Sequence, residues 1–293
     1  MLILVTGANG QLGKSIQSFS IQNNTAHNFV FASRDNLDLS CFDDIEYFIK
    51  AKKFDLIINC AAYTNVDEAE ENQNEAVLIN YLAVKKIAEV AYQRKIKLIH
   101  ISTDFVFDGF NSQPYKENDV TNPLNFYGKT KLSGENAILS IMKFNAIIIR
   151  TSWMYSEYGN NFVDTIMKLS LKGQDLKIVD DQTGNPTYAK DLVSAIFSIL
   201  DNKKYIKFGQ LSTIFHFSNE GACSWYDFAV EIINLSKCQI ILHPIKSKDY
   251  TFKAQRPKYV SMSKKKIIDE FGVKTFFWKD SLKTCLENLS QFN

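Results

Sequence analysis

The sequence has few of the residues that build metal centres and disulfide frameworks. Its 293 residues include five cysteines and four histidines, and no two cysteines form a CxxC pair. An odd number of scattered cysteines indicates reduced thiols in a cytoplasmic protein and excludes a disulfide framework. The histidines lack the spacing of metal ligands, so the sequence predicts no metal site.

Long apolar runs and an excess of one charge are also absent. No apolar run approaches the ~18 residues of a membrane-spanning helix, and the run Met1–Val5 is too short for a signal peptide. The 34 basic and 32 acidic residues leave a formal net charge of +2, which provides no electrostatic footprint for nucleic acid or an anionic membrane. We therefore expect a cytoplasmic globular protein with neither nucleic acid nor membrane as partner.

Short apolar strands alternate with helices through the first half of the chain. The pattern predicts strands at 2–6, 28–32, 55–59, 97–102 and 146–150, and helices at 11–22, 43–53, 74–95 and 126–143. This alternation is typical of an α/β fold with a doubly wound parallel sheet, the Rossmann architecture, covered by helices on both faces.

The alternation loosens after residue 150. Further strands are expected at 176–179, 214–217 and 240–242, and helices at 160–172, 191–201, 224–236, 264–271 and 280–289. Ser224 is a candidate cap for the helix at 224–236. We expect residues 1–152 to form a dinucleotide-binding domain to which 176–217 returns, and residues 153–175 and 218–293 to form a smaller α/β substrate-binding lobe.

A glycine motif lies between the first strand and the first helix. In Gly7-x-x-Gly10-x-x-Gly13, the first glycine permits a tight turn, the second lets a pyrophosphate approach the backbone, and the third lets helix and strand pack closely. The helix N-terminus then offers free N–H groups to the phosphates. The sequence thus predicts a dinucleotide site, and the GxxGxxG spacing resembles the short-chain dehydrogenase/reductase superfamily.

The end of the second strand bears on the choice between NADPH and NADH. Ser33 and Arg34 favour the 2′-phosphate of NADPH, whereas Asp35 leaves NADH open. Arg34 could also be an ordinary surface charge.

A tyrosine and a lysine four residues apart provide candidate acid–base chemistry. Tyr127 and Lys131 lie on one face of the helix expected at 126–143. An ammonium beside a phenol lowers the phenol's pKa towards neutrality, which suits proton transfer. Thr103 follows the fourth strand, at the carboxyl edge where ligands bind in such sheets. These three residues are the predicted catalytic set, and Asn80 is a candidate residue behind the Tyr/Lys pair.

Seven segments in order along the chain resemble the dTDP-4-dehydrorhamnose reductase family, in the extended branch of the superfamily. They are LVTGANGQLG (4–13), NCAAYTNVDEAE (59–70), STDFVFDG (102–109), YGKTKLSGE (127–135), RTSWMY (150–155), DDQTGNPTYAKDL (180–192) and RPKYVSM (256–262).

The resemblance assigns roles to individual residues. It implies that the pyrophosphate is held by Gly7, Gly10, Gln11, Leu12 and Gly13, and that Asp38 and Leu39 lie near the adenine. It places Ala61, Ala62, Tyr63, Thr64 and Ser102 along the cofactor, and Thr103, Asp104 and Trp153 against the sugar. Arg256 is a candidate for the substrate diphosphate, with a salt bridge between the lobes as the alternative.

The implied reaction reduces the C4 keto group of the nucleotide sugar dTDP-4-dehydro-L-rhamnose to dTDP-L-rhamnose, a precursor of cell-surface polysaccharide. NADPH or NADH provides the hydride and Tyr127 the proton. Two alternatives stay open: a reductase of a related nucleotide 4-keto-6-deoxy sugar, and a non-catalytic NADP-binding regulatory subunit. A dehydratase is disfavoured, because Asp104 is followed by Phe105 and not by a second carboxylate.

Some relatives carry a glutamate after the third glycine that joins a magnesium-bound dimer interface. Here Lys14, Ser15 and Ile16 follow, which argues against a magnesium-linked dimer and leaves a homodimer of another kind open.

Overall fold

Six parallel strands form the central sheet, in the order β10-β5-β4-β3-β1-β2. The computed structural model describes residues 1–206 and 209–292; residues 207–208 and 293, which fall in the expected segments 176–217 and 218–293, lie outside the described part. The strands are β1 (Leu2–Thr6), β2 (Asn28–Ala32), β3 (Leu56–Asn59), β4 (Lys97–Thr103), β5 (Ala146–Thr151) and β10 (Thr213–His216). The predicted doubly wound α/β class is confirmed.

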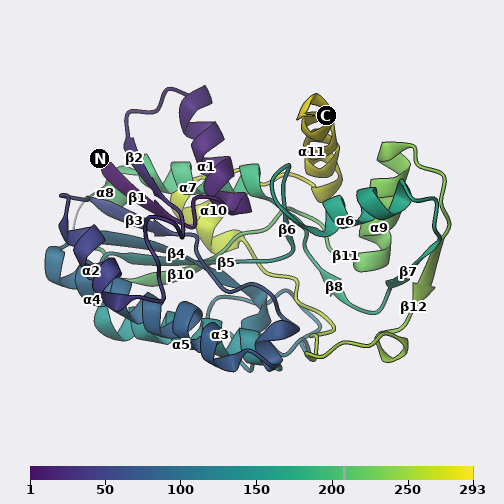
Figure 1. Ribbon diagram of the computed structural model, residues 1–293, viewed down its shortest axis with the longest axis horizontal. Helices are drawn as coiled ribbons and strands as arrows, with labels where there is room; N and C mark the ends of the chain where they lie inside the picture. Colours follow the sequence, from purple (N-terminus) through teal and green to yellow (C-terminus); the bar gives the residue numbers. More distant parts are fainter. Residues whose placement is uncertain (207–208, 293) are drawn as a thin grey trace.

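Helices cover both faces of this sheet (Figure 1). One face carries α1 (Gln11–Gln22), α7 (Ala189–Leu200) and α10 (Lys265–Phe271), and the other carries α2 (Phe42–Lys50), α4 (Val84–Arg94) and α5 (Phe126–Ile141). Successive strand residues point to opposite faces. Ile3 and Val5 therefore join the core under α1 and α7, whereas Leu4 joins the core under α4 and α5.

The helix expected at 74–95 is interrupted. It consists of α3 (Gln73–Val77), a π-helical segment η2 (Leu78–Ala83) and α4. Hydrophobic spacing does not reveal such an insertion, because the π-turn changes the hydrogen bonding without changing which residues are apolar. π-turns are frequent at functional sites, and η2 contains Asn80.

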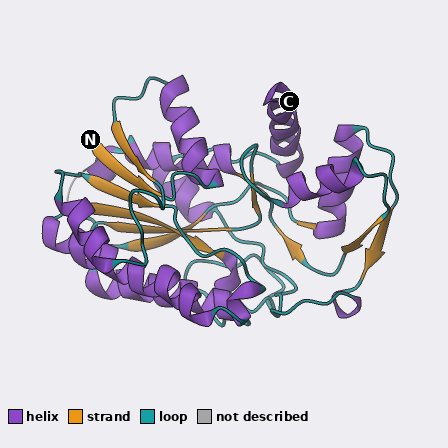
Figure 2. Ribbon diagram, in the orientation of Figure 1, coloured by secondary structure: helices purple, strands orange, loops and turns teal. Residues whose placement is uncertain are grey.

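The second lobe is built on α6 (Phe162–Ser170), α9 (Trp225–Ser236) and α11 (Trp278–Phe292), which share a separate apolar core. Three two-stranded sheets complete it (Figure 2): β7 (Leu176–Val179) with β12 (Leu242–Ile245), β8 (Thr183–Gly184) with β11 (Cys223–Ser224), and β6 (Met154–Tyr155) with β9 (Thr187–Tyr188). Ser224 and Asp227 form the capping box that begins α9, as its sequence position predicts.

The stretch 176–217 divides between the two parts of the molecule. We expected all of it beside the central sheet, but β7 pairs with β12 and not with a strand of that sheet. Only the later part returns: α7 packs against α1, and β10 pairs with β5. The segment 218–293 also divides, because α10, which we expected in the second lobe, packs against β10 of the central sheet. The short elements are η1 (Glu68–Glu70), η3 (Asp104–Val106), α8 (Lys203–Ile206) and η4 (Ser247–Asp249). Within the described ranges, none of the helices is both long and apolar enough to cross a membrane.

Candidate active site

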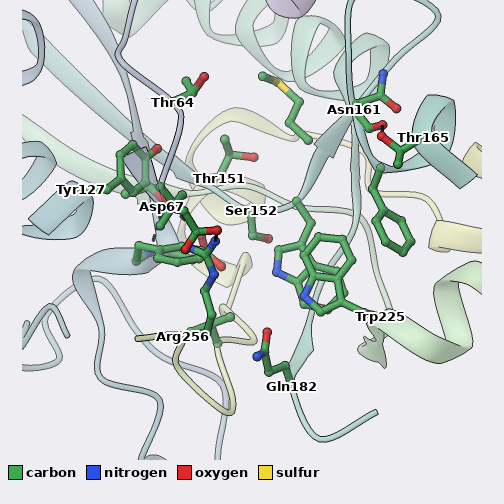
Figure 3. Close-up of a pocket in the computed structure, with 18 of the residues that line it drawn as sticks. Thr64, Asp67, Tyr127, Thr151, Ser152, Asn161, Thr165, Gln182, Trp225 and Arg256 are labelled. Atoms are coloured by element: carbon green, nitrogen blue, oxygen red, sulfur yellow. Dashed lines mark hydrogen bonds and ion pairs between the residues drawn. The ribbon is translucent and has the colours of Figure 1, made fainter. Parts of the chain in front are cut away.

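A cavity of about 700 Å³ opens at the carboxyl edge of the central sheet, between the sheet and the second lobe. Figure 3 shows Tyr127, Asp67 and Arg256 on one side of it and Trp225, Gln182 and Asn161 on the other. The predicted site residues that line it are Gln11, Ala62, Thr64, Ser102, Thr103, Asp104, Tyr127, Lys131, Trp153 and Arg256. The carboxyl edge is where ligands bind in open α/β sheets.

The glycine turn has the geometry of a phosphate cradle. Gly7 has φ +68°, and a Cβ there would lie 2.8 Å from the Ala61 nitrogen; a Cβ at Gly13 would lie 2.4 Å from the Gly7 carbonyl oxygen. Gly10 precedes α1 without a side-chain cap, and the first turn of α1 carries no acidic residue. The free N–H groups and the positive dipole end of α1 therefore fit the pyrophosphate of a dinucleotide.

Other predicted cofactor residues lie outside the cavity itself: Gly7, Gly10, Leu12, Gly13, Ser33, Arg34, Asp38, Leu39, Ala61 and Tyr63. The side chains of Leu12 and Leu39 are buried in the two cores of the sheet, which leaves only their backbones to meet a ligand. Arg34 is exposed just after β2. The Asp38 carboxylate accepts from the Ser40 backbone nitrogen at 2.9 Å, and this bond lowers its pKa.

Asn80 connects the loop after β3 to α5. Its side-chain oxygen accepts from the Tyr63 backbone nitrogen at 2.9 Å, and its nitrogen donates to the Tyr63 carbonyl at 3.0 Å and to the Thr130 hydroxyl at 3.2 Å. The π-turn thus places a buried amide behind the Tyr/Lys pair. It fixes the backbone next to Ala62 and Thr64, both of which line the cavity.

Tyr127 is at the start of α5, where the Asn125 side chain caps the helix by accepting from the Gly128 nitrogen at 2.8 Å. The phenol is 9% exposed and lines the cavity. Burial raises the pKa of Tyr127 to about 12; a hydrogen bond with Thr103 opposes this and the nearby Asp104 charge adds to it. The structure therefore differs from our expectation that Lys131 lowers this pKa towards neutrality.

The position of the Lys131 ammonium explains that difference. Its Nζ donates to the Ile101 carbonyl at 2.7 Å and lies 3.4 Å from His100 Nε2. The side chain is buried, and burial lowers the pKa of Lys131 to about 8, with the nearby Glu135 charge opposing the change. Lys131 still lines the same cavity as Tyr127.

Thr103 and Asp104 stand at the junction of β4 and η3. The Thr103 hydroxyl donates to Asp104 Oδ1 at 3.1 Å and accepts from the Phe105 nitrogen at 3.2 Å. Among the described residues Asp104 Oδ2 has no hydrogen-bond partner although it is buried. Burial raises the pKa of Asp104 to about 7, which the Thr103 bond partly offsets. The pair therefore presents a carboxyl group to a polar ligand in the cavity.

Ser102 is held by a buried ion pair. Its hydroxyl donates to Glu135, which also accepts from Arg150 through Nε at 3.0 Å and Nη2 at 2.7 Å. All three side chains are almost fully buried. Glu135 and Arg150 thereby tie α5 to β4 and β5 directly beneath the cavity.

Two tryptophans form an aromatic wall on the lobe side. Trp153 has φ +45° and stacks on Trp225 with ring centroids 3.6 Å apart. Gly184 leaves room for the Trp153 ring, because a Cβ there would lie 2.6 Å from it. Trp153 was predicted from the sequence, but Trp225 was not. Trp225 is the first residue of a capped helix, and nothing in its sequence position indicates a ligand-binding role.

Arg256 makes an ion pair with Asp67, and both residues line the cavity. Its Nη2 donates to Asp67 Oδ2 at 2.8 Å, and its guanidinium lies over the rings of Phe105 and Phe252. The salt bridge that we considered as an alternative is therefore present, yet Arg256 also lines the cavity. Asp67, which sequence reasoning missed, fixes the 253–256 segment further by accepting from the Ala254 nitrogen at 2.9 Å.

No group of three or more His, Cys, Asp or Glu side chains in the described part of the chain could hold a metal ion. Of the three residues that follow Gly13, Ser15 is buried and donates to the Gln11 carbonyl at 2.8 Å.

The parallel sheet, the glycine turn and the Thr/Tyr/Lys set at one cavity define a Rossmann-type oxidoreductase of the short-chain dehydrogenase/reductase kind. The family model of the RmlD substrate binding domain matches residues 1–291. The chain belongs to this family.

Individual relatives agree over their full lengths. A dTDP-4-dehydrorhamnose reductase of Aggregatibacter actinomycetemcomitans is 37% identical over 290 residues, 96% of this chain and 97% of its own. The crystal structure of a dTDP-4-dehydrorhamnose reductase from Clostridium acetobutylicum superposes with a TM-score of 0.92 at 37% identity, covering 99% of this chain and 100% of its own. One from Bacillus anthracis, in complex with NADP, gives 0.90 at 31% identity, covering 98% and 99%.

Proposed function

We propose that this protein reduces the C4 keto group of dTDP-4-dehydro-L-rhamnose to dTDP-L-rhamnose with NADPH. The observation that carries the proposal is the convergence of Thr103, Tyr127 and Lys131 on the cavity that Trp153 and Arg256 also line. The likeness to full-length reductases of this name supports the choice of substrate.

The cofactor side of the site suits NADPH. Gly7, Gly10 and Gly13 would hold its pyrophosphate at the start of α1, and Lys131 would face its nicotinamide ribose from α5. When bound, NADPH supplies the hydride. Arg34 stands after β2, where a 2′-phosphate would be recognised.

Tyr127 acts as the proton donor in this proposal. A phenol whose pKa is about 12 is fully protonated at neutral pH, which is the form a donor needs. Its hydrogen bond with Thr103 stabilises the phenolate left after donation. The buried positive charge of Lys131, in the same cavity, also stabilises that phenolate.

The remaining residues would position the sugar nucleotide. Asp104 has a carboxyl oxygen without a partner in the described part of the chain, free for a sugar hydroxyl, and Trp153 offers an aromatic ring. Arg256 has a buried Nη1 with no partner among the described residues, so it can turn one N–H to a phosphate oxygen while it keeps Asp67.

The test is turnover of purified protein with dTDP-4-dehydrorhamnose, followed by NADPH absorbance and by product NMR. We expect NADPH oxidation and an L-rhamnose configuration at C4. Tyr127→Phe should lower turnover by on the order of 100-fold or more, while Tyr92→Phe, at an exposed site on α4, should leave it unchanged. The C4 epimer would instead indicate a reductase that delivers the hydride to the other face of the carbonyl, and no turnover would favour a non-catalytic NADP-binding subunit.

The proposal includes a homodimer in the cytoplasm. Light scattering of the purified protein measures the first, and cell fractionation measures the second. A monomeric mass at micromolar concentration would remove the dimer from the proposal.

A further inference from the structure

A row of buried polar side chains crosses three strands and ends at Lys131. Thr6, Asn59 and His100 are register partners on β1, β3 and β4. The Thr6 hydroxyl and Asn59 Oδ1 are 2.6 Å apart, Asn59 Nδ2 and His100 Nδ1 are 3.0 Å apart, and His100 Nε2 is 3.4 Å from Lys131 Nζ. None of the four residues is more than 2% exposed.

This row lies on the otherwise apolar face of the sheet. Leu4, Ile57 and Leu98 occupy the same face two residues earlier on each strand and belong to the core under α4 and α5. Buried polar groups are costly unless each one is hydrogen-bonded. A polar row in this position is therefore best explained by the group at its end, which is the ammonium of Lys131.

The donors and acceptors around His100 determine which of its ring nitrogens carries the hydrogen. An ammonium has only donors, so a neutral His100 must accept at Nε2 and carry its hydrogen on Nδ1. The Asn59 side chain then accepts from Nδ1 through its oxygen and donates to the Thr6 hydroxyl through its nitrogen. This arrangement interchanges Oδ1 and Nδ2 by a 180° rotation of the amide group. With the Ile101 carbonyl, His100 occupies two of the three N–H groups of Lys131 and leaves the third for the cavity that Lys131 lines.

We propose that His100, oriented by Asn59 and Thr6, is a positioning residue that accepts a hydrogen bond from the Lys131 ammonium, keeps it charged and aims its remaining N–H into the cavity. The role rests on the proposed function only in taking Lys131 as the catalytic lysine.

The other groups around Lys131 do not replace this contact. Glu135 lies on the same helix and its charge raises the pKa of Lys131, but its carboxylate oxygens accept from Ser102 and Arg150. Cys60 follows β3, and burial raises the pKa of its thiol to about 12, so it is uncharged. Burial also lowers the pKa of His100 well below its ordinary value, which keeps the imidazole neutral and able to accept.

The test compares two substitutions of His100. Glutamine can place Oε1 where Nε2 stood, whereas leucine removes the acceptor at similar volume. In cofactor-free protein labelled with ¹³C at lysine Cε, the Lys131 signal, assigned by its loss in Lys131→Met, reports the pKa of Lys131 directly. His100→Leu should lower that pKa by at least about one unit, since an ammonium without its acceptor is disfavoured by burial, and His100→Gln should stay within about half a unit.

His216→Leu is the matched control, because His216 is also fully buried in the central sheet, on β10, and bonds to the Tyr115 carbonyl away from the cavity. It should leave the Lys131 titration unchanged. If His100→Leu does not fold, His100→Met replaces it with the same expectation.

An unchanged or raised Lys131 pKa in the apolar variant overturns the proposal; a rise would mean that Nε2 donates to a neutral amine. The alkaline limb of kcat/KM should move with the titration. Full NADPH-dependent activity in Lys131→Met would instead defeat the catalytic assignment of Lys131 and leave the titration result standing.

Discussion

The buried carboxyl of Asp104 should contribute less to the stability of the fold as the pH rises from 4 to 8. In the folded chain the pKa of Asp104 is about 7, raised from the ordinary 3.8 mainly by burial. Between these two values the unfolded chain has lost this proton and the folded chain still holds it. The contribution of Asp104 to the free energy of unfolding therefore falls with pH in this window, at 1.36 kcal/mol per pH unit for one proton.

The size of the effect follows from the same two values. The difference between 3.8 and about 7 corresponds to about 4 kcal/mol, nearly all of it lost by pH 8. Asp104→Asn removes the ionisation and keeps the shape. The free energy of unfolding of the variant, relative to that of the wild type, should therefore rise by up to about 4 kcal/mol between pH 4 and pH 8. A cost of the amide that is the same at both pH values does not affect this difference.

Urea denaturation of both proteins at pH 4, 6 and 8, without ligand, measures this difference. Asp108→Asn is the matched control with the opposite sign. Burial alone would raise the pKa of Asp108, but hydrogen bonds from Phe110, Tyr115 and Asn122 lower it overall. Its carboxylate therefore stabilises the fold above the unfolded pKa and loses that contribution as the pH falls. A constant difference between wild type and Asp104→Asn at all three pH values would refute the reasoning.

Three further predictions concern the cofactor turn, the ribose and the buried ion pair. Gly13→Ala should weaken NADP⁺ binding at least about 10-fold in a fluorescence titration and lower the melting temperature, because its Cβ would lie 2.4 Å from the Gly7 oxygen; Gly10→Ala, with its nearest atom at 3.3 Å, should melt close to wild type. Arg34→Ala should raise the Kd for NADPH more than that for NADH, and equal changes would remove the NADPH preference. Glu135→Gln should cost about 3–5 kcal/mol in urea denaturation, because it leaves the Arg150 charge buried and unpaired; a loss below about 1 kcal/mol would contradict this.

Features that depend on neighbouring residues in the chain were predictable from the sequence. The glycine turn, the Ser224 cap and the pairing of Tyr127 with Lys131 on one helix face all follow from spacings of a few residues. The order of strands and helices follows from hydrophobic periodicity in the same way. These local signals were sufficient for the α/β class and for much of the cavity lining.

Features that depend on segments far apart in the chain were not predictable. β7 pairs with β12 across more than 60 residues of sequence, and nothing within 176–179 distinguishes that partner from a strand of the central sheet. Asp67 meets Arg256 because the lobe folds back over the sheet, and Trp153 meets Trp225 because segments far apart in the sequence pack together within the lobe. The π-turn at Asn80 does not change which residues are apolar, so hydrophobic periodicity does not reveal it.

The electrostatics of the Tyr/Lys pair were the least accessible from sequence, and the reason concerns the mechanism. Helix spacing places the two side chains on one face, but the Ile101 carbonyl and His100 take two donors of the ammonium, and burial governs both pKa values. Tyr127, at about 12, stays protonated through the physiological range, whereas Lys131, at about 8, and Asp104, at about 7, change charge within it. In the ligand-free protein, Lys131 and Asp104 are therefore the two of these three groups that gain or lose a proton near neutral pH. Tyr127 remains a protonated donor throughout this range. Transfer of its proton depends on a developing negative charge at the substrate oxygen, on the hydrogen bond with Thr103 and on Lys131 keeping its charge.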